Sequence, residues 1–148
     1  MKIIFKKPIS PDKILKVMKK PNRVKLKRKL DIVFSPIIRE RDKGKPCIDG
    51  CGRKGEQAGH FRRRELMATR WHPQNVNGQS AYCNAWDNDG YRHAIGIDKR
   101  WGKGTAKKLE LLSRQTKQWS VEELLALIEA CKLGYERYCE VYKSLSTD

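Results

Sequence analysis

The chain has 148 residues, of which 39% are hydrophobic, so it can bury one modest core and leaves little room for two large domains. Its formal net charge of +16 is far from the near-neutral balance of an ordinary cytosolic enzyme and indicates a polyanionic partner, with nucleic acid as the first candidate. No apolar run reaches membrane-spanning length and no signal peptide is recognisable, so we expect an intracellular protein without membrane contact. The odd count of five cysteines favours free thiols over a disulfide framework.

The positive charge is concentrated in residues 1–45, which contain sixteen lysines and arginines and only four acids. We interpret this segment as a basic arm that contacts DNA, and a solvated charged face is the alternative. Basic residues are most closely spaced within the arm at Lys25, Lys27, Arg28 and Lys29.

The arm contains three local patterns. A Ser-Pro step at residues 10–11 predicts the start of a short helix that ends at Pro21. Between Val24 and Phe34 apolar residues nearly alternate with basic ones, which predicts a strand or an extended segment. A second Ser-Pro step at residues 35–36 indicates the opening of a short helical turn.

Three cysteines have spacings that suggest a metal site. Cys47 and Cys51 are separated by three residues, one more than in the common zinc knuckle, and Cys83 supplies a third thiol. Ser80 stands where the partner of Cys83 would be expected. Three thiolates completed by water, a histidine or Ser80 could hold Zn²⁺, and buried free cysteines are the alternative.

A candidate general base follows the first cysteine pair. Residues 57–61 predict a short strand with His60 near its end, and Arg62, Arg63 and Arg64 come directly after it. Nearby positive charge disfavours the imidazolium, so we expect a neutral His60 that can accept a proton near pH 7. These surroundings favour catalysis over a surface histidine in a loop.

The next segment is rich in turn-forming residues and polar amides. Residues 71–77 lead to a second predicted strand that ends at residues 82–83. Asn75 could pin the preceding loop or orient His60. Asn84 is expected to open a helix or turn, where its carboxamide oxygen could bind a hard cation.

Residues 87–89 precede Gly90 and are predicted to form a turn rather than a metal site. A helix is predicted from Tyr91 to Trp101. His93 lies within it and faces either the site or the core, so both metal ligation and core packing remain open for this residue.

Two helices are expected at the C-terminal end. Thr105 is predicted to cap a helix through Leu112, and Ser120 with Glu123 forms a capping box for the last helix. In that last helix, apolar residues from Val121 to Leu145 follow the three-four spacing of a coiled-coil seam. The stripe could form a homodimer or pack onto the chain's own core.

Together these motifs resemble those of the phage recombination-protein family called NinG or Rap, and more broadly those of HNH, or His-Me finger, endonucleases. The motifs that carry the resemblance are Cys47-x3-Cys51-Gly52, Ala58-Gly59-His60-Phe61, Arg70-Trp71-His72-Pro73 with Asn75 and Asn77, and Cys83-Asn84 followed by Tyr91-x-His93.

The resemblance implies an α+β fold with a small ββα-metal core, HNH-like and related to the treble clef, at residues 46–104. A basic N-terminal arm with short helices, residues 1–45, would precede this core, and C-terminal helices, residues 105–148, would follow it. It implies a phage-encoded endonuclease, dependent on Mg²⁺ or Mn²⁺, that cuts branched DNA such as Holliday junctions in the cytoplasm of the bacterial host.

The resemblance also implies roles for individual residues. His60 would be the general base, Asn75 would orient it, Asn84 would be a ligand of the catalytic cation and His93 an auxiliary ligand. A structural Zn²⁺ would be held by the three cysteines, Cys47, Cys51 and Cys83. Independently of the resemblance, four arginines lie close in sequence to the proposed base, where they could bind phosphates on either side of the scissile one: Arg62, Arg63, Arg64 and Arg70.

Phosphodiester cleavage needs a base for the attacking water and a cation for the charge on the phosphate, and the segment around His60 offers both. A non-catalytic nucleic-acid-binding accessory protein, in which the same residues only stabilise a small fold, is the alternative. A ribosome- or RNA-associated basic protein is a third interpretation, but it leaves the histidine and asparagine series unexplained.

Overall fold

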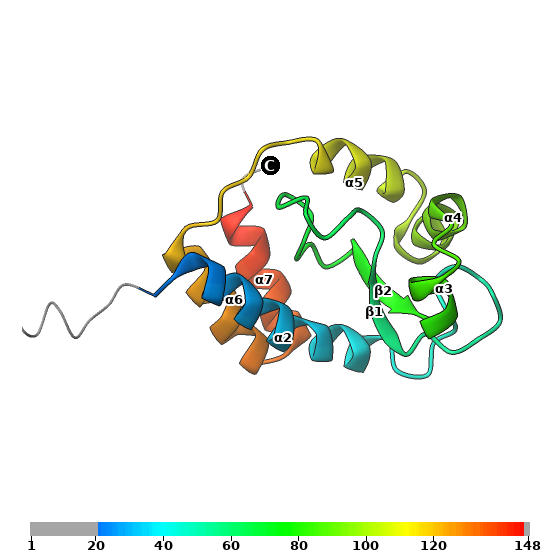
Figure 1. Cartoon of the computed structure of the whole chain (residues 1–148), viewed down its shortest axis with the longest axis horizontal. Coiled ribbons are helices and arrows are strands. Elements are labelled where there is room, and N and C mark those ends of the chain that lie inside the picture. Colours follow the sequence, from blue (N-terminus) through cyan, green and yellow to red (C-terminus); the bar gives the residue numbers. More distant parts are fainter. Residues whose placement is uncertain (1–20, 147–148) are drawn as a thin grey trace, which may run out of the picture.

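The computed structural model describes residues 21–146. In this range six helices surround a two-stranded antiparallel sheet, so the fold class is α+β (Figure 1). The elements are α2 (Arg23–Arg41), β1 (Gln57–His60), β2 (Val76–Gln79), α3 (Ala81–Ala85), α4 (Gly90–Trp101), α5 (Thr105–Ser113), α6 (Val121–Lys132) and α7 (Tyr135–Leu145). The helix predicted after residue 10 lies outside the described residues. None of the helices between residues 21 and 146 is long and apolar enough to cross a membrane.

Helix α2 occupies the segment for which a basic strand was predicted, so that prediction was wrong. The side chain of Asn22 caps the helix by accepting a hydrogen bond from the Val24 N–H at 2.8 Å. The buried side chains lie four residues apart and form one stripe: Leu26, Leu30, Phe34 and Ile38. Residues four apart lie on one face of a helix, but they also lie on one face of a strand, so this spacing alone fits both structures. The segment is helical because its apolar stripe packs against α6 and α7. The turn predicted at Pro36 lies inside this helix.

The single long C-terminal helix predicted from the sequence is in fact two helices. The capping box at the start of α6 is confirmed: the Ser120 hydroxyl accepts from the Glu123 N–H at 3.1 Å, and the Ser120 N–H donates to the Glu123 carboxylate at 2.9 Å. Gly134, with φ of 104°, separates α6 from α7 and lets the chain fold back. Figure 1 shows both helices beside α2.

The apolar stripe of this C-terminal segment is buried within the chain. Its buried members, which pack with α2 in the larger core, are Leu124, Ile128, Cys131, Tyr138 and Tyr142. The stripe therefore covers the chain's own core, and the homodimer stays a prediction.

The strands β1 and β2 pair with Gly59 opposite Asn77 and His60 opposite Val76. The strand around His60 is thus confirmed. The second strand ends at Gln79, three residues before the predicted end, because Ser80 caps α3 by accepting from the Cys83 N–H at 3.1 Å.

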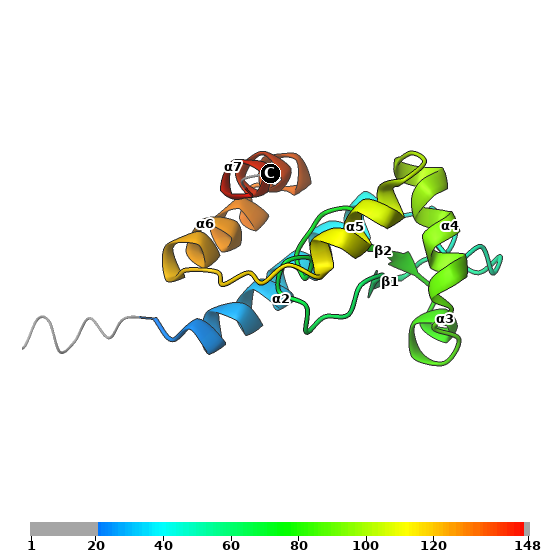
Figure 2. The same cartoon turned by 90° about the horizontal axis from the view of Figure 1, so that it is seen from above.

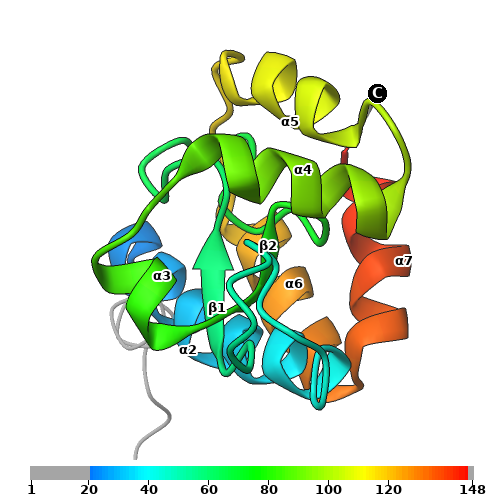
Figure 3. The same cartoon turned by 90° about the vertical axis from the view of Figure 1, so that its right-hand side faces the viewer.

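Helices α3 and α4 lie at the end of the molecule away from the start of α2, and α4 runs past the sheet to α5 (Figures 2 and 3). Helix α4 matches its prediction within one residue. It packs so closely on the loop that holds Ile48 that a Cβ at Gly96 would lie 1.8 Å from the Ile48 carbonyl oxygen. Thr105 is the first residue of α5 rather than its predicted cap, which is Gly104.

A buried ion pair joins α2 to the rest of the fold. The guanidinium of Arg41 lies 5.0 Å from the ring centres of both Trp101 and Tyr135 and donates to the Val76 carbonyl at 2.8 Å. Its neighbour Asp42 is fully buried. The Asp42 carboxylate accepts from the Arg41 guanidinium and from the Gly78 N–H, each at 2.7 Å, and from Arg100 at 3.1 Å. These contacts fix the end of α2 against β2, α4 and α7.

Candidate functional site

A cleft of about 790 Å³ opens between α2, β1 and α3. Its lining includes residues from all three elements and from the connecting loops: Asp31, Ile32, Arg39, Ala58, His60, Arg63, Arg64, Glu65, Asn84 and Asn88. The structure thus brings the predicted base, His60, and the predicted cation ligand, Asn84, to one cleft. Two of the arginines predicted to contact DNA lie there as well.

His60 is held in one tautomer. Its Nε2 lies 2.9 Å from the main-chain carbonyl oxygen of Arg70, and because a carbonyl only accepts, Nε2 must carry the proton. The lone pair of Nδ1 is then the basic site of the ring. Burial lowers the pKa of His60, and the charges of Arg64 and Arg70 act in the same direction. The direction of this shift agrees with the neutral imidazole expected from the sequence, but its largest cause is burial rather than the nearby positive charge.

Asn75 pins the loop between β1 and β2. Its Oδ1 accepts from the Arg62 N–H at 2.8 Å, and its Nδ2 donates to the Thr69 carbonyl at 3.0 Å and to the Arg62 carbonyl at 3.2 Å. These bonds involve the main chain at both ends of the loop that precedes Arg70. Asn75 therefore acts on the loop, the first of its two predicted roles, and reaches His60 only through it.

Sequence reasoning missed Asp31, which organises the cleft from α2. Its carboxylate accepts from Arg64 at 2.6 Å, from Arg70 Nε at 3.1 Å and from the Trp71 indole at 2.9 Å. Burial raises the pKa of Asp31, but the hydrogen bonds from Arg70 and Arg64 outweigh it, so the net pKa is lowered. In the sequence Asp31 is only one acid in a basic arm, and nothing local indicates its partners.

The predicted DNA-contacting arginines have different surroundings. Arg63 is exposed at the cleft, and Arg64 keeps 57% of its side chain exposed while it pairs with Asp31. Arg70 is mostly covered by its ion pair with Asp31, and Arg62 donates to the Ser113 hydroxyl at 3.1 Å.

Helix α2 carries four basic residues that were predicted to contact DNA. Three of them are exposed: Lys25, Arg28 and Lys29. The fourth, Lys27, is half-buried. Their positions leave the apolar stripe of α2 free to face the core.

His93 lies in the interior rather than in the lining of the cleft. Its side chain is 1% exposed, its Nδ1 is 3.2 Å from Asp49 Oδ1, and its ring centre is 5.4 Å from that of Phe61. Burial lowers the pKa of His93 to about 4, and the charge of Asp49 opposes this shift. Of the two orientations that the sequence left open, the structure shows the one toward the core. Residues 87–89, for which a turn was predicted, form the irregular connection between α3 and α4, and Asp89 caps α4 by accepting from the Tyr91 N–H at 3.0 Å.

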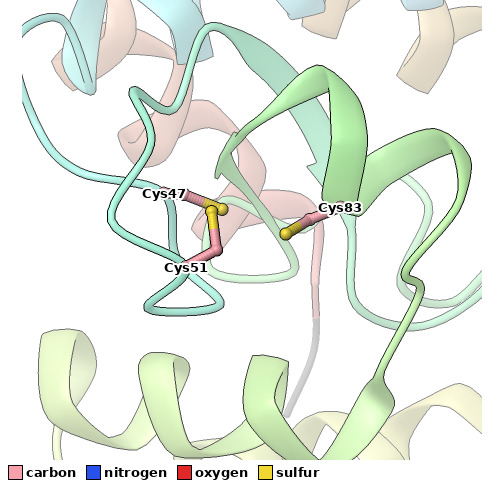
Figure 4. Close-up of side chains that lie close together, drawn as sticks. All are labelled: Cys47, Cys51 and Cys83. Carbon is pink, nitrogen blue, oxygen red and sulfur yellow. The ribbon is translucent and has the colours of Figure 1, made fainter.

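The three cysteines converge. The sulfur atoms of Cys47, Cys51 and Cys83 all lie within 4.8 Å of one another (Figure 4). Ser80 is the fourth polar group, because its hydroxyl is 3.5 Å from the Cys51 sulfur and its N–H donates to the Cys47 sulfur at 3.2 Å.

The chemistry of this donor set fits a metal, and Zn²⁺ is the ion that such thiolates prefer. The Ser80 hydroxyl lowers the pKa of Cys51 to about 6, and burial raises that of Cys83 to about 11. Within residues 21–146, one group of three or more His, Cys, Asp or Glu side chains has its ligand atoms close enough together to hold a metal ion. That group is the cluster of Cys47, Cys51 and Cys83.

The donors for a hard cation are fewer. Asn84 lies inside α3, not at its start, and its Nδ2 donates to Gln57 Oε1 at 2.8 Å, so Oδ1 is the atom that could bind a cation. Asn88 and Glu65 add oxygen atoms to the same cleft. Because Mg²⁺ usually takes one or two protein ligands together with phosphate oxygens, this set fits the ion only with nucleic acid bound.

Comparison with protein families matches residues 10–138 to the family described as Bacteriophage Lambda NinG protein. No curated protein and no solved structure shows a significant match. The matched range contains the cleft, the cysteine cluster and most of the C-terminal helices. The chain therefore belongs to the bacteriophage lambda NinG family.

Proposed function

We propose that the protein is a metal-dependent endonuclease that cuts branched DNA during phage recombination. The observation that carries the proposal is the geometry at His60, which lines an arginine-containing cleft and donates its Nε2–H to the Arg70 carbonyl, so that Nδ1 is left as the basic nitrogen. Membership in a recombination-associated phage family supports DNA intermediates as the substrate. The net charge of +16 supports a polyanion.

In the proposed reaction, Nδ1 of His60 takes the proton of the water that attacks the phosphodiester. The bond from Nε2 to the Arg70 carbonyl keeps the correct tautomer and favours the imidazolium that forms. Arg63 and Arg64, at the same cleft, bind phosphates beside the scissile one. A divalent cation bound by Asn84 Oδ1 and by phosphate oxygens would stabilise the charge that develops on the phosphate and the leaving oxygen.

The cysteine cluster has a structural part in this proposal. A Zn²⁺ bound by Cys47, Cys51 and Cys83 would tie the loop that carries the first two to α3, which carries Asn84. The cation ligand would then be held in place by the metal rather than by the short helix alone.

The proposal is tested with purified protein and three labelled DNAs: a four-way junction, a linear duplex and a single strand. Cleavage is measured with Mg²⁺, with Mn²⁺ and with EDTA. His60→Ala removes the base and leaves the arginines in place, so cleavage of the junction should fall by about 10²- to 10⁴-fold while junction affinity stays unchanged.

His72→Ala is the matched control, because it removes an imidazole that packs on Tyr142, outside the lining of the cleft. It should cut at nearly the wild-type rate. Both variants are melted thermally to show that they are folded. If folded His60→Ala cuts junctions as fast as the wild type, the site is no nuclease and the accessory-protein interpretation replaces it.

A further inference from the structure

Trp86 differs from the other tryptophans of the chain. Trp71 and Trp119 are buried, and Trp101 is half-buried and donates its indole N–H to Asn77 at 2.9 Å. The side chain of Trp86 is 82% exposed. A large aromatic side chain left in water loses the stabilisation that burial would provide, and such residues mark binding surfaces.

Other aromatic residues accompany it. Tyr82, 49% exposed, lies one helical turn earlier on α3, and the Trp86 N–H donates to its carbonyl at 2.9 Å. The guanidinium of Arg53 lies 4.4 Å from the centre of the Tyr82 ring. Tyr91, at the start of α4, is 76% exposed. The short segment from residue 82 to residue 91 therefore presents three aromatic rings to solvent beside a cation.

This aromatic segment is continuous in the chain with residues of the His60 cleft. Asn84 and Asn88, which precede and follow Trp86 by two residues, line the cleft. Tyr82, Trp86 and Tyr91 lie outside that lining, because side chains two residues apart on a helix point in different directions. The arginines of the cleft attract phosphates, and the rings on the neighbouring surface offer flat, apolar faces.

Nucleobases provide such a face when they are unpaired. In a duplex the base faces are stacked on one another, whereas in single strands and at branch points they are free to stack on aromatic side chains. A protein partner would also cover an exposed tryptophan. The guanidinium of Arg53 against Tyr82 and the excess of positive charge favour nucleic acid instead.

We propose that Trp86 and Tyr82 form a stacking platform for unpaired DNA bases at α3, the helix whose Asn84 lines the His60 cleft. The inference rests on the proposed function in one respect: it names the feature of branched DNA that the protein would recognise. Binding by the platform does not require cleavage, so the two can be tested separately.

The first measurement uses Trp86 as its own reporter. Without added Mg²⁺ or Mn²⁺, a thymidine oligonucleotide should quench the fluorescence of the wild-type protein, because Trp86 is the indole most accessible to a base. Trp86→Phe keeps an aromatic ring, so it should retain most of the affinity but lose most of the quenching. Unchanged quenching in Trp86→Phe would place the bound DNA elsewhere and overturn the platform.

The second measurement compares affinities at fixed salt without added Mg²⁺ or Mn²⁺. Trp86→Ala should weaken binding of the thymidine oligonucleotide by about 5- to 150-fold, the loss expected for one stacked base, and leave binding of a blunt duplex unchanged. Because Trp86 is exposed, this variant should fold. Leu133→Ala is the matched control, since Leu133 is 72% exposed after the end of α6, and it should bind both DNAs as the wild type does.

Equal loss of affinity for both DNAs, or no loss for either, would overturn the platform, as would a wild-type protein that binds only duplex. If Trp86→Ala binds the single strand normally while junctions are cut in a His60-dependent way, the platform fails and the nuclease stands. If binding depends on Trp86 but nothing is cut, the nuclease fails and the platform stands.

Discussion

Asp31 and Arg70, 39 residues apart in the sequence, form a two-point ion pair beside the cleft, in which Arg70 donates to the carboxylate from both Nε and Nη2. The main-chain carbonyl of the same arginine accepts the Nε2–H of His60. Asp31 on α2 therefore fixes the position of Arg70, and the main chain of Arg70 orients the proposed base, His60. This arrangement makes Asp31 a positioning residue whose removal has measurable consequences.

Asp31→Asn should lower the free energy of unfolding by about 1–3 kcal/mol, because Arg70 and Trp71 lose a charged acceptor. It should also lower the pKa of His60, measured by NMR titration, since the charge of Asp31 raises that pKa. Junction cleavage should fall more than junction binding. Glu110→Gln, which removes a surface acid of α5, is the control and should leave the His60 titration in place. The same titration curve in Asp31→Asn and the wild type would contradict the positioning role.

The second prediction concerns acid stability and Asp42. Burial raises the pKa of Asp42, but its bond with Arg41 outweighs this, so the folded-state pKa is below that of the unfolded chain. The stability that the charged form provides is therefore present above about pH 4 and is lost as the pH falls through the folded-state pKa. Asp42→Asn should cost about 3–5 kcal/mol at pH 7, and the difference from the wild type should shrink below about pH 4.

The measurement for Asp42 is denaturant unfolding at a series of pH values. Glu129→Gln removes an exposed carboxylate of α6 and should follow the wild-type curve throughout. A pH-independent difference between Asp42→Asn and the wild type would show that the ion pair is not the source of the effect.

The third prediction concerns the cysteine cluster. If Cys47, Cys51 and Cys83 hold a metal, elemental analysis should find about one zinc per chain. Cys83→Ala should lose that zinc and melt at a lower temperature, as should the wild type treated with a strong chelator. Cys139→Ala, in α7, should keep both the zinc and the melting temperature. Zinc-free wild-type protein of full stability would show that the thiols stabilise the fold by packing alone.

The fourth prediction concerns the basic face of α2. Replacing Lys25, Arg28 and Lys29 by glutamine removes exposed charge and leaves the buried Leu26 and Leu30 in place. If these residues bind phosphates, the logarithmic salt dependence of DNA affinity should become shallower by about 0.9 for each phosphate that is no longer neutralised. The matched control replaces three exposed lysines near α5, Lys103, Lys107 and Lys108. Equal changes in the two triple variants would indicate a general charge effect instead of a DNA-binding face.

Features that depend on a few neighbouring residues could be predicted from the amino-acid sequence. The capping box of α6 needs only Ser120 and Glu123, whose bonds close within one turn. The strand that ends at His60 is similarly local. The spacing of Cys47 and Cys51, similar to that of zinc ligands, can also be seen in the sequence. That Cys83 lies beside them is a result of the fold.

Features that depend on contacts between distant segments could not be predicted in this way. Leu26 and Leu30 fit both a strand and a helix, and helix α2 forms because it sets one continuous stripe against α6 and α7. The long apolar pattern after Ser120 divides at Gly134 because folding back buries it against α2. The partners of Asp31 and the burial of His93 against Asp49 likewise arise from contacts between segments far apart in the chain, which no local pattern encodes.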